Sequence, residues 1–92
     1  MTSVYRLIYA RSILKDLEKI PESCILQIEK SFSQIGTDPF TRGVKKLKGS
    51  RKGQSILRYR SGNYRIIYQV DTEKKIIFIL AVKHRKEAYR SN

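Results

Sequence analysis

The chain has 92 residues, enough for one domain around one core, and its apolar content of 40% is that of a folded rather than a disordered chain. Twenty lysine and arginine residues oppose eight acidic ones, so the net charge is +12 at pH 7, and such a surface attracts nucleic acid, acidic proteins or anionic lipid. A single cysteine and a single histidine exclude an internal disulfide and leave too few ligands for a structural zinc site.

The first part of the chain is expected to form one strand and a helical hairpin. Residues 4–9, with the sequence VYRLIY, are β-branched and aromatic, as is typical of a strand. Residues 12–20 carry apolar side chains at helical spacing, and Pro21 ends that pattern and suits the first turn of a second helix. We expect Gly36 to be the C′ residue that follows the second helix, with Cys24 as a small core residue rather than a reactive thiol.

The second part is expected to be mainly strands. Residues 37–53 hold Asp, Pro, Thr, three Gly and Ser between basic residues and indicate a loop. Three later segments have strand composition: 54–60, 63–70 and 75–82. The last residues, 84–92, suit a short helix or an extended tail. The order β-α-α-β-β-β, with a possible final helix, predicts one α+β domain over residues 1–92. It has two layers, a helical hairpin on one face of a mainly antiparallel four-stranded sheet.

Charge is distributed unevenly along the chain. The first 38 residues hold five basic and five acidic residues, whereas the segment from Pro39 to Val70 holds nine basic residues and no acidic one. This asymmetry indicates one basic surface. The alternative is a solvated face that only aids solubility, but interspersed charges would do that with less self-repulsion.

The central hairpin carries three arginines without a carboxylate near them in sequence. A two-residue loop at Ser61-Gly62 or Gly62-Asn63 would place Arg58, Arg60 and Arg65 on the face opposite the helices, whereas a three-residue loop would reverse this. Guanidinium groups on an open face suit phosphate recognition.

The segment after the last strand adds three functional groups within six residues. His84 could move a proton near neutral pH, Arg85 adds a guanidinium, and Tyr89 could stack on a base. The alternatives are an exposed polar residue at a strand end for His84 and a packing aromatic for Tyr89.

Three segments are distinctive besides the helical hairpin and the length: KLKG at 46–49, YRSGNYRIIY at 59–68 and VKHRKEAY at 82–89. In these features, and over essentially its whole length, the chain resembles the RelE/ParE superfamily of toxins from bacterial and archaeal type II toxin–antitoxin systems, and specifically its RelE-like branch.

This resemblance implies a metal-independent endoribonuclease without a cofactor, which cuts messenger RNA in the ribosomal A site and inhibits translation. The 2′-hydroxyl of the substrate attacks the adjacent phosphate and leaves a 2′,3′-cyclic phosphate, which requires a base, an acid and cations. The implied partners are the ribosome with its ribosomal RNA, the message, and a cognate acidic antitoxin. Because no apolar run approaches the roughly 20 residues of a membrane span and the N-terminus lacks a signal-peptide pattern, we expect no membrane partner and a soluble, cytoplasmic protein.

The resemblance also implies roles for individual residues. Arg65 matches the central arginine of the family's third strand, Arg85 matches the arginine just past the last strand, and Tyr89 is similar to the C-terminal tyrosine that stacks on the substrate base.

Two positions depart from the best-known member. Arg58 stands where that toxin has a lysine, and Ile56 stands where it has another. Arginine is a poor general base because its pKa exceeds about 12, so either His84 takes this role or catalysis is mainly electrostatic.

Six basic residues are expected to bind ribosomal RNA rather than to take part in chemistry: Lys45, Lys46, Lys48, Arg51, Lys52 and Arg60. The sequence leaves two other functions open, a ParE-like inhibitor of DNA gyrase and a non-catalytic RNA- or ribosome-binding module, because one fold can support all three.

Overall fold

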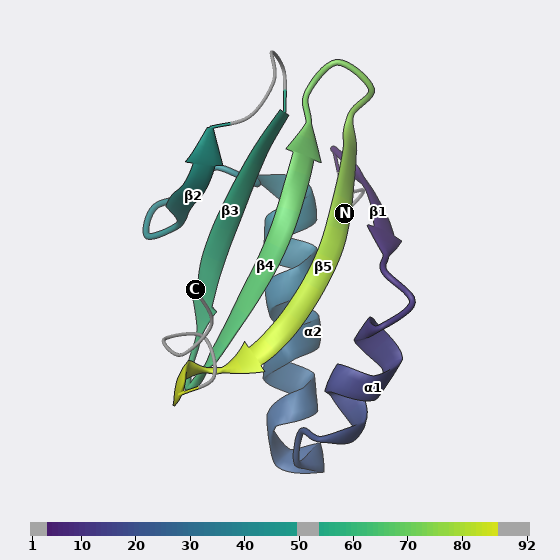
Figure 1. Cartoon of the computed structure of the whole chain (residues 1–92), viewed down its shortest axis with the longest axis vertical. Helices are drawn as coiled ribbons and strands as arrows, with labels where there is room; N and C mark the ends of the chain where they lie inside the picture. The colour runs from purple at the N-terminus through teal and green to yellow at the C-terminus, as the bar shows by residue number, and fades with distance from the viewer. Residues whose placement is uncertain (1–3, 50–53, 87–92) are drawn as a thin grey trace.

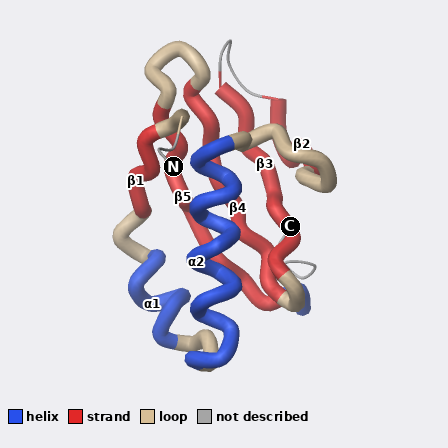
Figure 2. Tube along the Cα trace, turned by 180° about the vertical axis from the view of Figure 1, so that it is seen from behind, coloured by secondary structure: helices blue, strands red, loops and turns tan. Residues whose placement is uncertain are grey.

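A computed structural model describes residues 4–49 and 54–86 and consists of two layers, a five-stranded sheet and two helices on one of its faces (Figure 1). The elements in chain order are β1 Arg6–Tyr9, α1 Ile13–Glu18, α2 Glu22–Thr37, β2 Lys45–Gly49, β3 Gln54–Ser61, β4 Tyr64–Asp71 and β5 Ile76–His84. Seen from behind, α2 crosses the length of the sheet and α1 lies beside it (Figure 2). The predicted α+β class and helical layer are therefore confirmed.

The sheet has the strand order β1-β5-β4-β3-β2. β1 runs parallel to β5, and the other three pairs are antiparallel. The expected number of strands, four, was one too low, because β2 forms inside the segment that we expected to be a loop. The sequence of β2, KKLKG, is rich in lysine, a residue that natural edge strands use to discourage pairing with another chain. Lysine has a low strand propensity, so the pairing with β3, rather than the composition, stabilises this strand.

The core lies between α2 and the centre of the sheet. Ile28, Phe32 and Ile35 of α2 recur at helical spacing and are buried against strand residues such as Tyr68 and Ile79. Pro21 is the N-cap of α2. The helix continues one residue beyond Gly36, so our expectation that Gly36 follows it as the C′ residue was wrong.

A two-residue turn, Gly62-Asn63, joins β3 to β4. Gly62 has φ +60°, a conformation that glycine adopts without strain, and it occupies the first central position of the turn. Because Ser61 pairs with Tyr64, Arg60 pairs with Arg65.

β5 contains a bulge opposite the junction of Ile67 and Tyr68. Ala81 pairs with Ile67 and Ile79 pairs with Tyr68, so Leu80 is an extra residue in β5. The bulge shifts the alternation of side chains by one position, and both Ile79 and Val82 are therefore buried on the helix side. It also puts Lys83 opposite Arg65 in the register.

Candidate functional site

The arginines of the central hairpin lie on the predicted face. Leu57 pairs with the core residue Tyr68, so Arg58, one residue later, takes the face opposite the helices. Arg65 lies on the same face because Ile66, its neighbour, is buried in the core. We call the side of the sheet opposite α1 and α2 the open face.

Arg65 is the arginine held most firmly. Its side chain is only 5% exposed, and Nη1 donates hydrogen bonds to the carbonyl oxygens of Gly62 and Tyr64, both at 3.0 Å. The guanidinium is thus fixed against the turn of its own hairpin. Within residues 4–49 and 54–86 no carboxylate forms an ion pair with it, so its positive charge is not neutralised by that part of the chain.

Arg85 lies at the same end of the sheet. Its backbone N–H donates to the carbonyl of Asn63 at 2.7 Å, while Arg65 bonds to the carbonyl of Gly62. The carbonyl oxygens of Gly62 and Asn63 therefore hold the Arg65 side chain and the Arg85 backbone at the same turn. The Arg85 side chain is exposed, whereas Arg58 is half-buried.

Lys45 is a residue that the sequence argument assigned only to docking. It pairs with Arg58 across β2 and β3, and both therefore lie on the open face. Lys46 pairs with Leu57 and takes the opposite face. Ile56 stands where the best-known member of the family has a lysine, and it is half-buried two residues before Arg58 on the same strand. Among the described residues, Lys45 is therefore the lysine next to Arg58, because the two pair across β2 and β3. The alternation of lysine with Leu47 was a weak signal for this strand.

His84 is not brought onto the open face. It pairs with Tyr64, which packs on the core side of the sheet, and the two rings meet edge to face with centroids 5.4 Å apart. Its Nδ1 accepts the backbone N–H of Lys86 at 3.3 Å, which leaves Nε2 to carry the proton of the neutral ring.

Three candidate residues, Arg51, Lys52 and Tyr89, lie outside the described residues. Lys48 belongs to β2 by its backbone, where it pairs with Ile56. Arg60 is exposed at the edge of β3 and lines a pocket described below.

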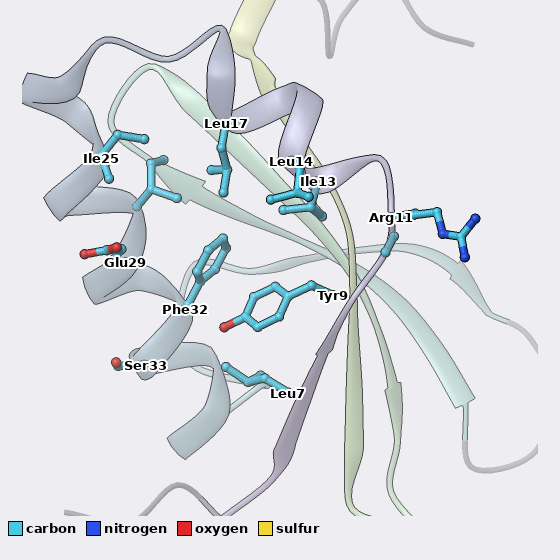
Figure 3. Close-up of a pocket in the computed structure, with 12 residues that line it drawn as sticks. Leu7, Tyr9, Arg11, Ile13, Leu14, Leu17, Ile25, Glu29, Phe32 and Ser33 are labelled. Atoms are coloured by element: carbon cyan, nitrogen blue, oxygen red, sulfur yellow. The ribbon is translucent and has the colours of Figure 1, made fainter.

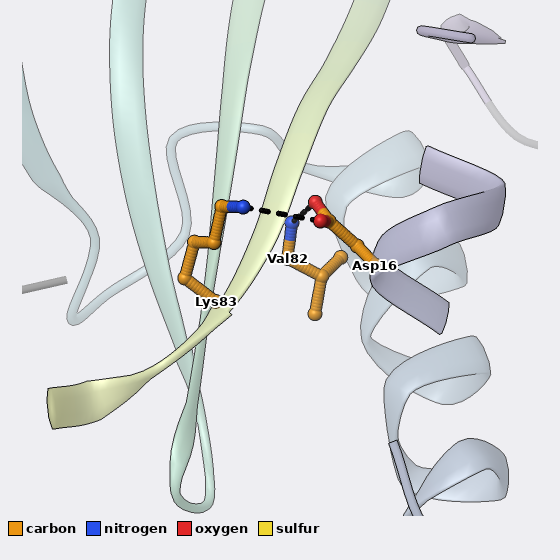
Figure 4. Close-up of polar contacts among 3 residues, drawn as sticks. All are labelled: Asp16, Val82 and Lys83. Atoms are coloured by element: carbon orange, nitrogen blue, oxygen red, sulfur yellow. Dashed lines mark hydrogen bonds and ion pairs between the residues drawn. The ribbon is translucent and has the colours of Figure 1, made fainter. Parts of the chain in front are cut away.

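Asp16 of α1 fixes the end of β5 that leads to Arg85 (Figure 4). Beyond the last β1 pair, Tyr9 with Ile79, the edge of β5 has no strand neighbour, and Asp16 occupies this place. Its carboxylate is 7% exposed, and it accepts the backbone N–H of Val82 at 3.0 Å and Nζ of Lys83 at 3.1 Å.

An apolar groove of about 570 Å³ lies on the opposite side of the molecule from the open face, between α1, α2 and β1 (Figure 3). Leu14 contributes to it although its side chain is 70% exposed. Tyr9 packs edge-on against Phe32, with ring centroids 5.3 Å apart, and burial, helped by the charge of Glu29, raises the pKa of the Tyr9 phenol.

Within the described part of the chain, no three His, Cys, Asp or Glu side chains cluster as metal ligands would. None of the helices described there is long and apolar enough to cross a membrane.

Comparison with known proteins places this arrangement in a family. Residues 7–89 match the family model described as "ParE toxin of type II toxin-antitoxin system, parDE". Toxin RelG of Mycobacterium tuberculosis is 30% identical over 87 residues, which cover 94% of this chain and 97% of RelG. The mRNA interferase toxin RelE of Escherichia coli is also 30% identical over 87 residues, covering 92% of this chain and 90% of that toxin.

The same relationship is visible in three dimensions. The archaeal RelE–RelB complex from Pyrococcus horikoshii OT3 contains a chain that superimposes with a TM-score of 0.80 at 29% identity, covering 89% of this chain and 96% of that one. The resemblance to the RelE/ParE superfamily is therefore confirmed, and the chain belongs to the ParE toxin family of type II toxin–antitoxin systems.

Proposed function

We propose that this toxin is a RelE-like endoribonuclease that cuts messenger RNA in the ribosomal A site by attack of the 2′-hydroxyl on the neighbouring phosphate. The observation that supports this most is the meeting of Arg65 and Arg85 at the Gly62-Asn63 turn, without a carboxylate partner in the described residues. The 30% identity to a protein named an mRNA interferase toxin agrees with it.

The proposed chemistry assigns most of the work to fixed positive charge. Attack by the 2′-oxygen adds negative charge to the non-bridging phosphate oxygens, and a cation that is already oriented stabilises this charge without reorganisation. Arg65, locked by two hydrogen bonds, suits this role, and Arg58 and Lys45 supply further charge on the same face. We assign Arg85, which is exposed beside the turn, the role of holding the leaving 5′-oxygen or the scissile phosphate.

His84 was the candidate for proton transfer, and Tyr89 was expected to stack on the substrate base or orient the scissile phosphate. The pairing of His84 with Tyr64, on the core side of the sheet, argues against a direct role for the imidazole. We therefore propose that charge stabilisation dominates. Lys46, Lys48, Arg51 and Lys52 orient the protein on ribosomal RNA, whereas Lys45, which we expected to share that role, adds its charge beside Arg58.

An acidic antitoxin is the proposed partner that restrains this activity. The P. horikoshii relative was solved as a RelE–RelB complex, and a chain of net charge +12 favours a partner of opposite charge. The groove between α1, α2 and β1 is the surface we assign to it, because exposed Leu14 and half-buried Leu17 offer apolar contacts for an amphipathic segment.

Reconstituted translation followed by primer extension tests the proposal. The wild-type protein should produce new 5′ ends inside codons and fragments that end in a 2′,3′-cyclic phosphate, and Arg85→Ala should produce at least about a hundredfold fewer. Intact messages with wild-type protein would overturn the assignment.

The ParE family match favours inhibition of DNA gyrase as the second candidate. A supercoiling assay separates the two, since the proposed ribonuclease should leave gyrase active. Translation inhibition with neither cleavage nor gyrase inhibition would instead indicate a non-catalytic ribosome-binding module.

A further inference from the structure

A second pocket, of about 510 Å³, opens at the outer edge of β3. The first pair between β2 and β3 is Lys45 with Arg58, so Tyr59 and Arg60 extend past the start of β2 and have no strand partner on that side. The connection from α2 into β2 (the teal loop in Figure 1) passes there, and Thr41, Arg42 and Gly43 line the pocket from it.

The chemistry of this pocket is that of an anion site. Two guanidinium groups, Arg42 and Arg60, line it together with the amide of Gln34, and none of the described residues contributes a carboxylate to it. Neither guanidinium forms a hydrogen bond or an ion pair with any residue in 4–49 or 54–86. Both arginines are exposed, so their guanidinium groups are accessible to a ligand.

The loop backbone leaves room for a ligand to approach. Gly43 has φ +96°, and apart from its two chain neighbours no atom of the described residues lies within 4 Å of the point where a Cβ would stand. The N–H groups of Arg42 and Gly43 have no acceptor in the described part of the chain and are available as donors. Consecutive backbone N–H groups beside cations favour phosphate.

The pocket adjoins the open face. Arg60 pairs with Arg65 in the register, and Arg58, two residues before Arg60, lies on the open face. A single nucleic-acid strand that crosses the open face at Arg65 can therefore continue over Arg60 into the pocket, where half-buried Tyr59 offers an aromatic ring for a base.

We infer that this pocket binds one phosphodiester of an RNA strand outside the bond that is cut, with Arg42 and Arg60 on the same phosphate. This inference rests on the proposed action on RNA. Phosphate is favoured over the carboxylates of an acidic protein because the lining pairs two forked guanidinium groups with an aromatic ring, the combination that recognises a nucleotide.

The test measures binding of a fluorescein-labelled 2′-O-methyl RNA oligonucleotide, which cannot be cut because its 2′-oxygen is blocked. Fluorescence anisotropy over a series of salt concentrations is recorded for wild type, Arg42→Ala, Arg60→Ala and the double variant. The matched control is Arg6→Ala, which removes the same charge from an exposed position on β1 at the opposite edge of the sheet.

Each pocket variant should bind about tenfold more weakly. The slope of log K against log salt should become shallower by about 0.7 when both arginines are removed, the value for one single-strand phosphate contact, and by less in each single variant, because the remaining arginine still holds the same phosphate. The double variant should lose about 0.7 in total and not twice that, because both arginines hold one phosphate. Arg6→Ala should keep the wild-type slope.

Three results would overturn the inference. The first is a pocket variant that behaves like Arg6→Ala, and the second is wild-type protein that does not bind the RNA. The third is competition by a polyglutamate peptide as effective as that of unlabelled RNA of equal charge, which would assign the pocket to an acidic protein. Amide spectra of each variant establish that the fold is retained.

The translation assay keeps this result separate from the proposed function. If the wild-type protein cleaves messages and Arg42→Ala and Arg60→Ala bind RNA as the wild type does, only the inference about the pocket is refuted. If RNA binding depends on these arginines but no message is cleaved, the inference about the pocket stands and the proposed ribonuclease activity is refuted.

Discussion

Arg65 combines a structural and a proposed catalytic role in one side chain. The sequence predicted an exposed cation on the open face, and the face is right, but the side chain is buried and bound to Gly62 and Tyr64. Burial of a charged group with hydrogen bonds to its own turn orients it before a substrate arrives. The same bonds stabilise the hairpin, so a substitution here affects both folding and activity.

Replacing Arg65 with alanine should lower message cleavage about a hundredfold to a thousandfold and reduce the free energy of unfolding by about 1 to 3 kcal/mol, since two carbonyls lose a charged donor. Arg65→Lys keeps a charge but not the fork, and it should recover part of the stability and little of the activity. Primer extension and urea denaturation measure the two effects. Wild-type cleavage by Arg65→Ala would contradict the proposed role.

Lys45 and Lys46 form a matched pair on one strand, because they differ in face but not in charge. Lys45→Ala should reduce the cleavage rate about tenfold by removing a cation beside Arg58, whereas Lys46→Ala should change mainly the concentration needed for half-maximal rate. Single-turnover cleavage on programmed ribosomes separates these quantities. Equal effects of both changes on the rate would show that the face of β2 does not matter.

His84 is expected to be dispensable for proton transfer, because its ring packs against Tyr64 on the core side. His84→Ala should keep the wild-type dependence of the cleavage rate on pH between about 5.5 and 8, the range in which a histidine changes charge. A bend in the wild-type profile that is absent in the variant would assign the proton to this residue.

Among the elements, β5 depends most on contacts that lie far away in sequence. Its last residues extend past β1, and the edge is satisfied by a helix side chain, Asp16, in place of a strand. Helix α1 is thereby linked to the position of Arg85 through the short stretch of backbone that follows Val82.

Asp16→Ala should lower the free energy of unfolding by about 2 kcal/mol, because a charged hydrogen bond to Val82 and the ion pair to half-exposed Lys83 are both lost. Asp16→Asn keeps an acceptor for the Val82 N–H and should cost about half as much. Hydrogen exchange of the Val82 amide, which should speed up in Asp16→Ala and much less in Asp16→Asn, checks the mechanism. Equal exchange in both variants would contradict it.

The sequence predicts the elements whose apolar residues recur at helix or strand spacing. It does not predict the elements that form only by pairing with a neighbouring strand. The α2 helix and the β3–β4 hairpin have strong local patterns, so the face of Arg58 and Arg65 followed from the Gly62-Asn63 turn. β2 was missed because lysine-rich edge strands resemble loops, and with it the pairing of Lys45 with Arg58. The bulge at Leu80 has no sequence signal, although it decides which face His84 takes.

At the scale of the whole molecule, alkaline pH acts on the core through its tyrosines. Tyr68 is fully buried, and its hydroxyl donates to the carbonyl of Pro39 at 2.6 Å. Burial, with smaller contributions from Tyr59 and Asp38, raises the pKa of the Tyr68 phenol. The folded state therefore holds this proton more tightly than the unfolded chain, in which a tyrosine has a pKa of about 10.

The contribution of Tyr68 to stability should accordingly be constant below about pH 10 and fall as the pH rises further, because the unfolded chain releases the proton first. Tyr68→Phe should be less stable at neutral pH by about 1 kcal/mol, through loss of the bond to Pro39, but should show a smaller decline above pH 10. The raised pKa of Tyr9 leaves some decline in this variant. Melting temperatures measured from about pH 8 to pH 11 test both statements, and parallel curves for wild type and variant would refute the role of Tyr68.

The parallel pairing of β1 with β5 has a consequence for the order of events during synthesis. Arg6 of β1 pairs with Ile76 of β5, so the sheet is complete only when both strands are available. Contacts between residues so distant in sequence form slowly. A chain that leaves the ribosome at about 5 to 20 residues per second cannot close this sheet until β5 has emerged from the exit tunnel. Arg85, which follows β5, reaches its place beside the hairpin turn later still. The arginine site is therefore assembled only after β5 has left the exit tunnel, so a nascent chain that has released only the first four strands carries an incomplete site.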